Sequence, residues 1–174
     1  VILNVAFCFT NKYPFIEYYH NSSFLEHGGS PERAVKTAFT SAVDKRLKAT
    51  GKYNKNESKI TFADIEDCLV LVTNSFSTQT SYANQTKKAI TNSFIAEAMT
   101  DFLKEQLEYF FAENPADADR FTAQVLVNKR SREQAESTRL NLKKKLAVST
   151  DVSNRVEKFV SCRSKDPDLR EVYI

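Results

Sequence analysis

The stretch that organises this chain is CLVLV, residues 68–72, an apolar run without alternation that is bounded by polar residues. Such a run is typical of a strand buried on both faces. Two further stretches, residues 1–10 and 14–22, are rich in Val, Ile, Phe and Tyr and also predict strands. The Asn11-Lys12 pair between them suits a tight turn, so these two strands are predicted to form a β-hairpin. We therefore expect a sheet built from residues 1–10, 14–22 and 68–76.

A helix is predicted directly after Gly28-Gly29, a pair that permits a sharp reversal of the chain. The Ser30-Pro31-Glu32 sequence supplies an N-cap, a proline at the first helical position and an early acid, and the helix ends near Gly51. Its apolar face consists of Val35, Phe39, Ala42, Val43 and Leu47. Thr61 and Asp64 are spaced as a capping box, which predicts the start of a short helix.

Two longer helices are predicted towards the C-terminus, separated by the Asn114-Pro115 break. The first runs from about Ser93 to Ala112, and the second from Ala116 to about Leu146. The apolar stripe of the first helix contains Ile95, Met99, Phe102, Leu103, Leu107, Phe110 and Phe111. The second half of the other helix has almost no apolar face, which is typical of a solvent-bridging helix.

These elements predict an α+β fold: a sheet with helices on one face, followed by a long protruding C-terminal helix. We divide the chain into an α+β core (residues 1–113), a long, partly basic helix (114–147) and a linker (148–174).

The composition of the chain excludes several function classes. Three cysteines, Cys8, Cys68 and Cys162, are odd in number and lack metal-ligand spacing, so they indicate reduced thiols in a cytoplasmic protein. No apolar run approaches the roughly 18 residues that a membrane span needs, so no membrane association is expected. The sequence has no glycine-rich phosphate loop, no Cys/His pair with nucleophile spacing and no metal-ligand cluster. We therefore expect neither an independent active site nor a metal site.

Positive charge is concentrated between residues 129 and 145, although the net charge of the chain is only +3. The seven basic residues are Lys129, Arg130, Arg132, Arg139, Lys143, Lys144 and Lys145, against Glu133 and Glu136. One interpretation is a solvated helix face. The other is nonspecific contact with DNA phosphates, because clustered Lys and Arg release counterions without reading sequence.

Lys87 lies in FSTQTSYANQTKK, residues 76–88, between a short apolar strand-like run and a strongly amphipathic helix. Such a connection predicts an exposed loop, where binding groups are commonly placed, although a lone lysine there is ordinarily a solvated charge. In an extended loop Gln85 shares a side with Lys87, and Lys88 points away. A compact ammonium beside an amide donor could hold a terminal phosphoryl group presented by another domain. His20 and His27 lack evident carboxylate partners, and a structural or surface role is predicted for both.

Three stretches in order resemble the transducer domain of bacterial type IIA topoisomerases, the B subunit of DNA gyrase and its topoisomerase IV counterpart. The first is NSSFLEHGGS, residues 21–30, similar to a strand end with a Gly-Gly turn into a helix. The second spans Phe76–Lys87 and is similar to the family's phosphate-sensing loop. The third is CRSKDP, residues 162–167, similar to the segment that leads into a Toprim domain.

The resemblance implies a GHKL-type ATPase whose ATP and Mg²⁺ are bound mainly outside this chain. Gln85 and Lys87 would reach the γ-phosphate, and the domain would couple the ATPase gate to DNA strand passage. It also implies a left-handed βαβ crossover, duplex DNA and the topoisomerase A subunit as partners, and a B subunit that dimerises on ATP binding. The chain alone is expected to be monomeric and to hydrolyse no ATP.

Two alternatives remain open. One is the middle domain of another GHKL ATPase, in mismatch repair or a chaperone, which also donates a lysine. The other is a stand-alone nucleic-acid-binding module that uses the basic helix. Tight binding of duplex DNA by the chain alone, with a steep salt dependence, would favour the second alternative.

Overall fold

The computed structural model describes residues 1–149, 164 and 166–169. The predicted linker from residue 148 therefore lies mostly outside the described residues, and so do Cys162, Arg163 and Lys165 of the stretch CRSKDP. In chain order the elements are β1 (Ile2–Phe9), β2 (Phe15–His20), β3 (Ser23–Phe24), α1 (Ser30–Ala49), α2 (Phe62–Glu66), β4 (Leu69–Phe76), α3 (Ser93–Glu113), α4 (Pro115–Ser149) and a 3₁₀ turn (Pro167–Leu169). Over the part of the chain that the structure describes, no helix combines the length and apolarity needed to cross a bilayer.

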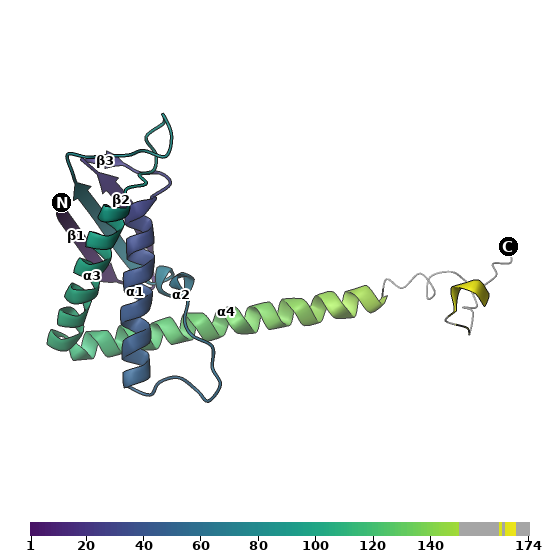
Figure 1. The fold of residues 1–174 in the computed structure, drawn as a ribbon. Coiled ribbons are helices and arrows are strands. Elements are labelled where there is room, and N and C mark those ends of the chain that lie inside the picture. The colour runs from purple at the N-terminus through teal and green to yellow at the C-terminus, as the bar shows by residue number, and fades with distance from the viewer. Residues whose placement is uncertain (150–163, 165, 170–174) are drawn as a thin grey trace. The chain divides into compact units, whose positions relative to one another are not determined.

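The four strands form one mixed sheet in the order β1-β4-β2-β3 (Figure 1). Strand β4 pairs antiparallel with β1, where Val5 lies opposite Thr73. It pairs parallel with β2, where Tyr18 lies opposite Thr73. The predicted β-hairpin between residues 1–10 and 14–22 is therefore wrong, because β4 lies between β1 and β2.

The central position of β4 explains why the local turn signal failed. The Leu69–Phe76 strand forms hydrogen bonds along both edges, and the Thr10 amide extends the β1 ladder to the Cys68 carbonyl at 3.0 Å. Strand β2 then runs parallel to β4, which requires a long crossover rather than a short turn. Helices α1 and α2 lie in that crossover and complete a βαβ unit.

Helices α1 and α3 cover one face of the sheet (Figure 1). On that face Leu69, Leu71, Thr73 and Ser75 of β4 are buried, while the alternate residues of the same strand are only half-buried. The prediction of a strand buried on both faces is thus correct for one face only. The predicted fold class, a sheet with helices packed on one face, is confirmed.

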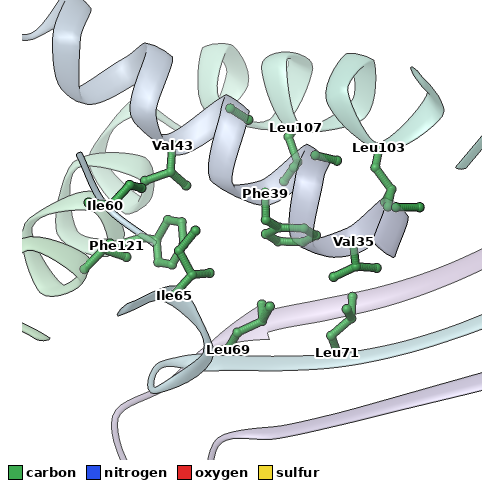
Figure 2. Packing of buried hydrophobic residues seen from close by; sticks show 14 of the residues in the cluster. Val35, Phe39, Val43, Ile60, Ile65, Leu69, Leu71, Leu103, Leu107 and Phe121 are labelled. Carbon is green, nitrogen blue, oxygen red and sulfur yellow. The ribbon is translucent and has the colours of Figure 1, made fainter. Parts of the chain in front are cut away.

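The core forms where α1 and α3 meet the covered face of the sheet. Figure 2 shows Val35 and Phe39 of α1 lying over Leu69 and Leu71 of β4. All five residues predicted for the apolar face of α1 are buried. The capping box of α2 is formed as predicted between Thr61 and Asp64.

One member of the predicted α3 stripe does not belong to it, because Phe102 is 38% exposed. The buried residues of α3 follow a regular spacing of four: Ile95, Met99, Leu103, Leu107 and Phe111. Phe102 precedes Leu103 by one residue, which turns its side chain about 100° around the helix and away from the core. Phe110 is half-buried and packs against the core edge-on to Phe7, with 5.4 Å between ring centroids.

The first turns of α4 belong to the core. Phe121 stacks on Phe9 of β1 with 3.5 Å between the ring centroids, and Ala118, Val125 and Leu126 are buried. The chain accordingly divides into two compact units, Val1–Ser131 and Arg132–Ile174. This boundary falls later than residue 113, where the sequence suggested it. In the second unit, residues 133–147 are exposed, in keeping with their lack of an apolar face.

Candidate functional site

The connection between β4 and α3 folds back on itself as a small hairpin (Figure 1, teal). Tyr82 and Ile90 form an antiparallel bridge. The Ala83 amide donates to the Ala89 carbonyl at 2.9 Å, and the Thr91 amide donates to the Ser81 carbonyl at 2.8 Å. The loop is exposed at its tip, but it is not extended. Strand alternation therefore does not decide where the side chains of Gln85, Lys87 and Lys88 point. The turn at the tip decides it.

A tight turn forms the tip of the hairpin. The Lys87 amide donates to the Asn84 carbonyl at 3.2 Å, and the Thr86 hydroxyl donates to the Asn84 side-chain oxygen at 2.6 Å. Lys87 has φ +56°, in the left-handed region that non-glycine residues rarely adopt. Gln85 is exposed at the centre of this turn, two residues from Lys87, as the sequence suggested.

The two adjacent lysines of the loop have different surroundings. The Lys87 ammonium lies 5.6 Å from the centroid of the Tyr82 ring, and within residues 1–149 no carboxylate forms an ion pair with it. Lys88, in contrast, forms an ion pair with Glu26, and the hydrogen bond from Lys88 holds the pKa of Glu26 below its usual value. Lys87 and Lys88 were predicted to differ because of strand alternation. In the structure they differ because Glu26 pairs with Lys88 alone. Of the two ammonium groups, that of Lys87 is available to an anion.

The base of the hairpin is clamped to the start of α1. The Ser30 amide donates to the Ile90 carbonyl at 2.9 Å, and the His27 amide donates to the Lys88 carbonyl at 2.9 Å. Gly29 has φ +87°, and a Cβ atom added to it would lie 2.2 Å from the Ile90 carbonyl oxygen. Only glycine permits this approach. The Gly-Gly turn and the Lys87 loop, which the sequence presented as separate features, thus form one structural unit.

A buried histidine fixes the start of the loop. The two ring nitrogens of His20 lie 2.8 Å from the Ser75 hydroxyl and 2.8 Å from the Thr80 hydroxyl. Burial lowers the pKa of His20, so that the neutral ring is favoured. These contacts support the structural role predicted for His20. They join the end of β4 to the segment that leads to Lys87, and sequence reasoning had no signal for this pairing.

Two of the basic residues proposed to contact DNA are bound to an acidic residue of the chain. The Lys129 ammonium lies 3.3 Å from Glu57, and both side chains are buried, with 3% and 8% exposed. Arg130 forms two further hydrogen bonds to the same carboxylate, at 3.0 and 2.9 Å. These bonds, those of Arg130 foremost, lower the pKa of Glu57 to about 2. Lys129 is therefore withdrawn as a DNA-contact candidate, because its ammonium is buried and held by Glu57.

The other basic candidates lie on the second half of α4. Arg139 pairs with Glu136 one turn earlier at 2.7 Å, and both side chains are exposed. Arg132 is half-buried, whereas Lys143, Lys144 and Lys145 are exposed. Contact between these residues and DNA stays a prediction. No group of three potential metal ligands comes together among the residues that the structure describes.

Comparison with known proteins agrees with the resemblance seen in the sequence. The family described as DNA gyrase B matches residues 1–141. The DNA gyrase B subunit of Metamycoplasma arthritidis is 30% identical over the whole chain, which covers 27% of that protein. The DNA gyrase B subunit of Mycoplasmoides gallisepticum is 27% identical, also over the whole chain, which covers 26% of it. The chain thus spans about a quarter of the length of these relatives.

Solved structures support the same fold. The 43K ATPase domain of Thermus thermophilus gyrase B, solved with an aminocoumarin, matches with a TM-score of 0.70 and 23% identity, over 79% of this chain and 37% of that one. The ATP-binding domain of Francisella tularensis topoisomerase IV, solved with an inhibitor, matches with a TM-score of 0.68 and 22% identity, over 75% of this chain and 36% of that one. With the family match over residues 1–141, these findings establish that the chain belongs to the DNA gyrase B family.

Proposed function

We propose that this chain is the part of an ATP-dependent type II DNA topoisomerase B subunit that senses the γ-phosphate of ATP and couples the ATPase gate to DNA strand passage. The observation that carries the proposal is the Lys87 ammonium, exposed on a clamped loop and free of any carboxylate partner within residues 1–149. Membership of the DNA gyrase B family sets aside the mismatch-repair and chaperone alternatives.

The chemistry of Lys87 and Gln85 fits a terminal phosphate. An ammonium binds phosphate oxygens as a point charge, and the neutral Gln85 amide adds a weaker donor. A group that contacts only the γ-phosphate binds the ATP state and not the ADP state, so it can shift the arrangement of domains by its differential affinity. ATP with Mg²⁺, held mainly outside this chain, would supply the phosphoryl group. Lys87 would stabilise its charge during transfer without moving a proton.

The contacts at the two ends of α1 support a coupling role. At its first turn, Ser30 binds the carbonyl of Ile90 in the Lys87 hairpin. At its last turn, the Arg46 guanidinium binds Asp119 of α4 at 3.1 Å. A helix of 20 residues is about 30 Å long and rigid on this scale. A displacement of the hairpin would therefore be transmitted along α1 to the start of α4.

The same proposal assigns the partners of the complete protein. Duplex DNA would contact the exposed cluster Lys143–Lys145 weakly and without sequence preference, because phosphate contacts carry no sequence information. The topoisomerase A subunit would be the protein partner, the B subunit would dimerise on ATP binding, and the protein would act in the cytoplasm.

Steady-state ATPase and strand-passage assays of the complete B subunit with its A subunit test the proposal. Lys87→Ala is expected to lower ATP turnover about 100- to 1000-fold, the usual effect of removing one preorganised charged donor. Gln85→Ala should have a milder effect, because a neutral donor is weaker. Lys88→Ala is the matched control and should change little, since Lys88 is engaged with Glu26 at the surface.

Normal turnover in Lys87→Ala, or loss of turnover in Lys88→Ala alone, would refute the assignment of the loop. The isolated chain should hydrolyse no ATP. Magnesium-dependent turnover by the rigorously purified chain would contradict a purely coupling role.

A further inference from the structure

We propose that Tyr82 is the positioning residue for Lys87: its ring holds the Lys87 ammonium in place without neutralising the charge. The consequence for ATP turnover rests on the function proposed above, whereas the placement itself can be measured on this chain alone. The proposal rests on one distance. The Lys87 ammonium lies 5.6 Å from the centroid of the Tyr82 ring, within the range of a cation–π contact.

Backbone pairing and core packing hold the Tyr82 ring in place. Its backbone pairs antiparallel with Ile90, and Ile90 is fully buried and also bridges to Gly29 in parallel. The Tyr82 side chain is half-buried and packs against the hydrophobic core. A Tyr side chain has only two rotatable bonds, so a ring held in this way has little freedom left to lose. The ring therefore forms a rigid platform at the base of the hairpin.

The turn directs Lys87 back onto this platform. The hydrogen bond from the Lys87 amide to the Asn84 carbonyl closes the turn, and the left-handed φ of +56° reverses the chain at Lys87 itself. In an extended strand, Lys87 would instead lie on the face opposite to Tyr82, because the two residues are five positions apart. A non-glycine residue held at positive φ is uncommon and is concentrated where the surroundings determine it.

A ring is suited to hold a lysine that must bind phosphate. The carboxylate of Glu26 holds Lys88 by opposite charge, and a phosphate would have to compete with it. The face of an aromatic ring attracts the cation through its quadrupole but leaves the net charge and the outward N–H groups available. Tyr82 can thus reduce the freedom of the Lys87 side chain and leave its charge intact.

The ring, rather than the hydroxyl, is the part of Tyr82 that the proposal requires. Within residues 1–149 no hydrogen bond joins the Tyr82 hydroxyl to another group. Phenylalanine should therefore replace tyrosine here, whereas an aliphatic side chain should not. A cation–π contact at an exposed site corresponds to about a two- to fivefold change in an equilibrium constant.

The placement is tested on the chain itself by NMR after reductive ¹³C-methylation of its lysines, which retains their charge. The Lys87 signal, assigned by its loss in Lys87→Arg, should be shifted upfield by the ring current of Tyr82. Tyr82→Phe should keep this shift, and Tyr82→Leu should abolish it. An unshifted Lys87 signal in the unsubstituted chain, or a shift that persists in Tyr82→Leu, would overturn the proposal. Tyr82→Met, also without a ring, provides a second variant if the leucine variant fails to fold.

The consequence is tested by ATPase assays of the complete B subunit with its A subunit. Tyr82→Leu should lower kcat about two- to fivefold, and Tyr82→Phe should recover most of that loss. In the background of Lys87→Ala, Tyr82→Leu should cause no further loss, because the residue acts only through Lys87. If Lys87→Ala is crippled while Tyr82→Leu turns over normally, the positioning role is wrong. If Lys87→Ala itself turns over normally, the function proposed for the loop fails instead.

Discussion

Replacing Glu57 with glutamine is expected to destabilise the compact unit Val1–Ser131 by about 3 kcal/mol at neutral pH. The Glu57 carboxylate binds the buried ammonium of Lys129 at 3.3 Å and the guanidinium of Arg130 at 2.9 Å. Glutamine keeps the size of the side chain but removes its charge. The Lys129 ammonium, 3% exposed, would then remain buried after losing the charge of Glu57.

Two arguments give a similar magnitude. Removing one partner of a buried ion pair costs about 3–5 kcal/mol, because the other charge stays desolvated. Independently, the pKa of Glu57 is lowered from 4.5 to about 2, chiefly by the hydrogen bonds from Arg130. At about 1.4 kcal/mol for each pKa unit, this shift corresponds to about 3 kcal/mol. For a unit of this size, that change should lower the midpoint of thermal unfolding by about 10 °C.

The pH dependence gives a second, independent signature. Because the folded pKa of Glu57 lies below its unfolded value, its contribution is complete above pH 4.5 and is lost as the pH falls towards about 2. The difference in stability between the unsubstituted chain and Glu57→Gln should therefore be largest at neutral pH and should shrink across this acidic range. Circular dichroism melts and urea titrations at several pH values measure both signatures.

Matched variants separate the buried pair from a general effect of charge. Glu136→Gln makes the same chemical change in the exposed pair with Arg139 and should leave the unfolding midpoint unaltered. Adding Lys129→Met to Glu57→Gln should restore much of the lost stability, because the buried charge that Glu57 balanced is then removed as well. A midpoint for Glu57→Gln within about 2 °C of the unsubstituted chain, or a difference that persists unchanged in acid, would refute the reasoning.

Three further predictions follow from other contacts. Gly29→Ala should lower the unfolding midpoint more than Gly51→Ala, because an added Cβ meets the Ile90 carbonyl oxygen at 2.2 Å in the first and open space in the second; equal midpoints would contradict the clamp. An NMR titration should find that the His20 imidazole protonates below pH 6.5, because burial lowers its pKa. The stability that neutral His20 contributes should therefore be complete above pH 6.5 and be lost as the pH falls below that value. Replacing Lys143–Lys145 with glutamine should reduce the salt dependence of duplex binding, measured by fluorescence anisotropy, by about 0.9 in the log–log slope for each phosphate interaction that is removed. An unchanged slope would place the DNA contacts elsewhere.

Local signals predicted the helices and the position of the loop well. The apolar face of α1 was predicted correctly, as was the capping box at Thr61. The N-cap predicted at Ser30 was wrong by one residue, because Gly29 is the N-cap and no side chain caps the helix. Both correct predictions depend on residues within a few positions of one another, where helix geometry decides the contacts. The exposed position of Lys87, between a buried strand and an amphipathic helix, was predicted for the same reason. Its role in phosphate sensing came from family resemblance and stays a proposal.

The pairings between distant segments were not predictable in the same way. The Asn11-Lys12 turn favoured a hairpin, but β4 paired with both β1 and β2 and separated them. The contacts of Lys88 with Glu26 and of Lys129 with Glu57 join residues that are far apart in the sequence. From the sequence, Lys129 looked like one more member of a basic cluster. Its burial could not be predicted, because burial depends on which distant residues pack around a side chain.

The sequence by itself determined the order and type of most elements, the apolar face of α1, and the loop that carries Gln85 and Lys87. Only the tertiary structure decided the strand order, the docking of that loop against Gly29, and which lysines are free to bind an anion. The physical reason is the range of the interactions. Helix periodicity and capping act over one or two turns, whereas strand pairing, burial and ion pairing depend on groups that only the folded chain brings together.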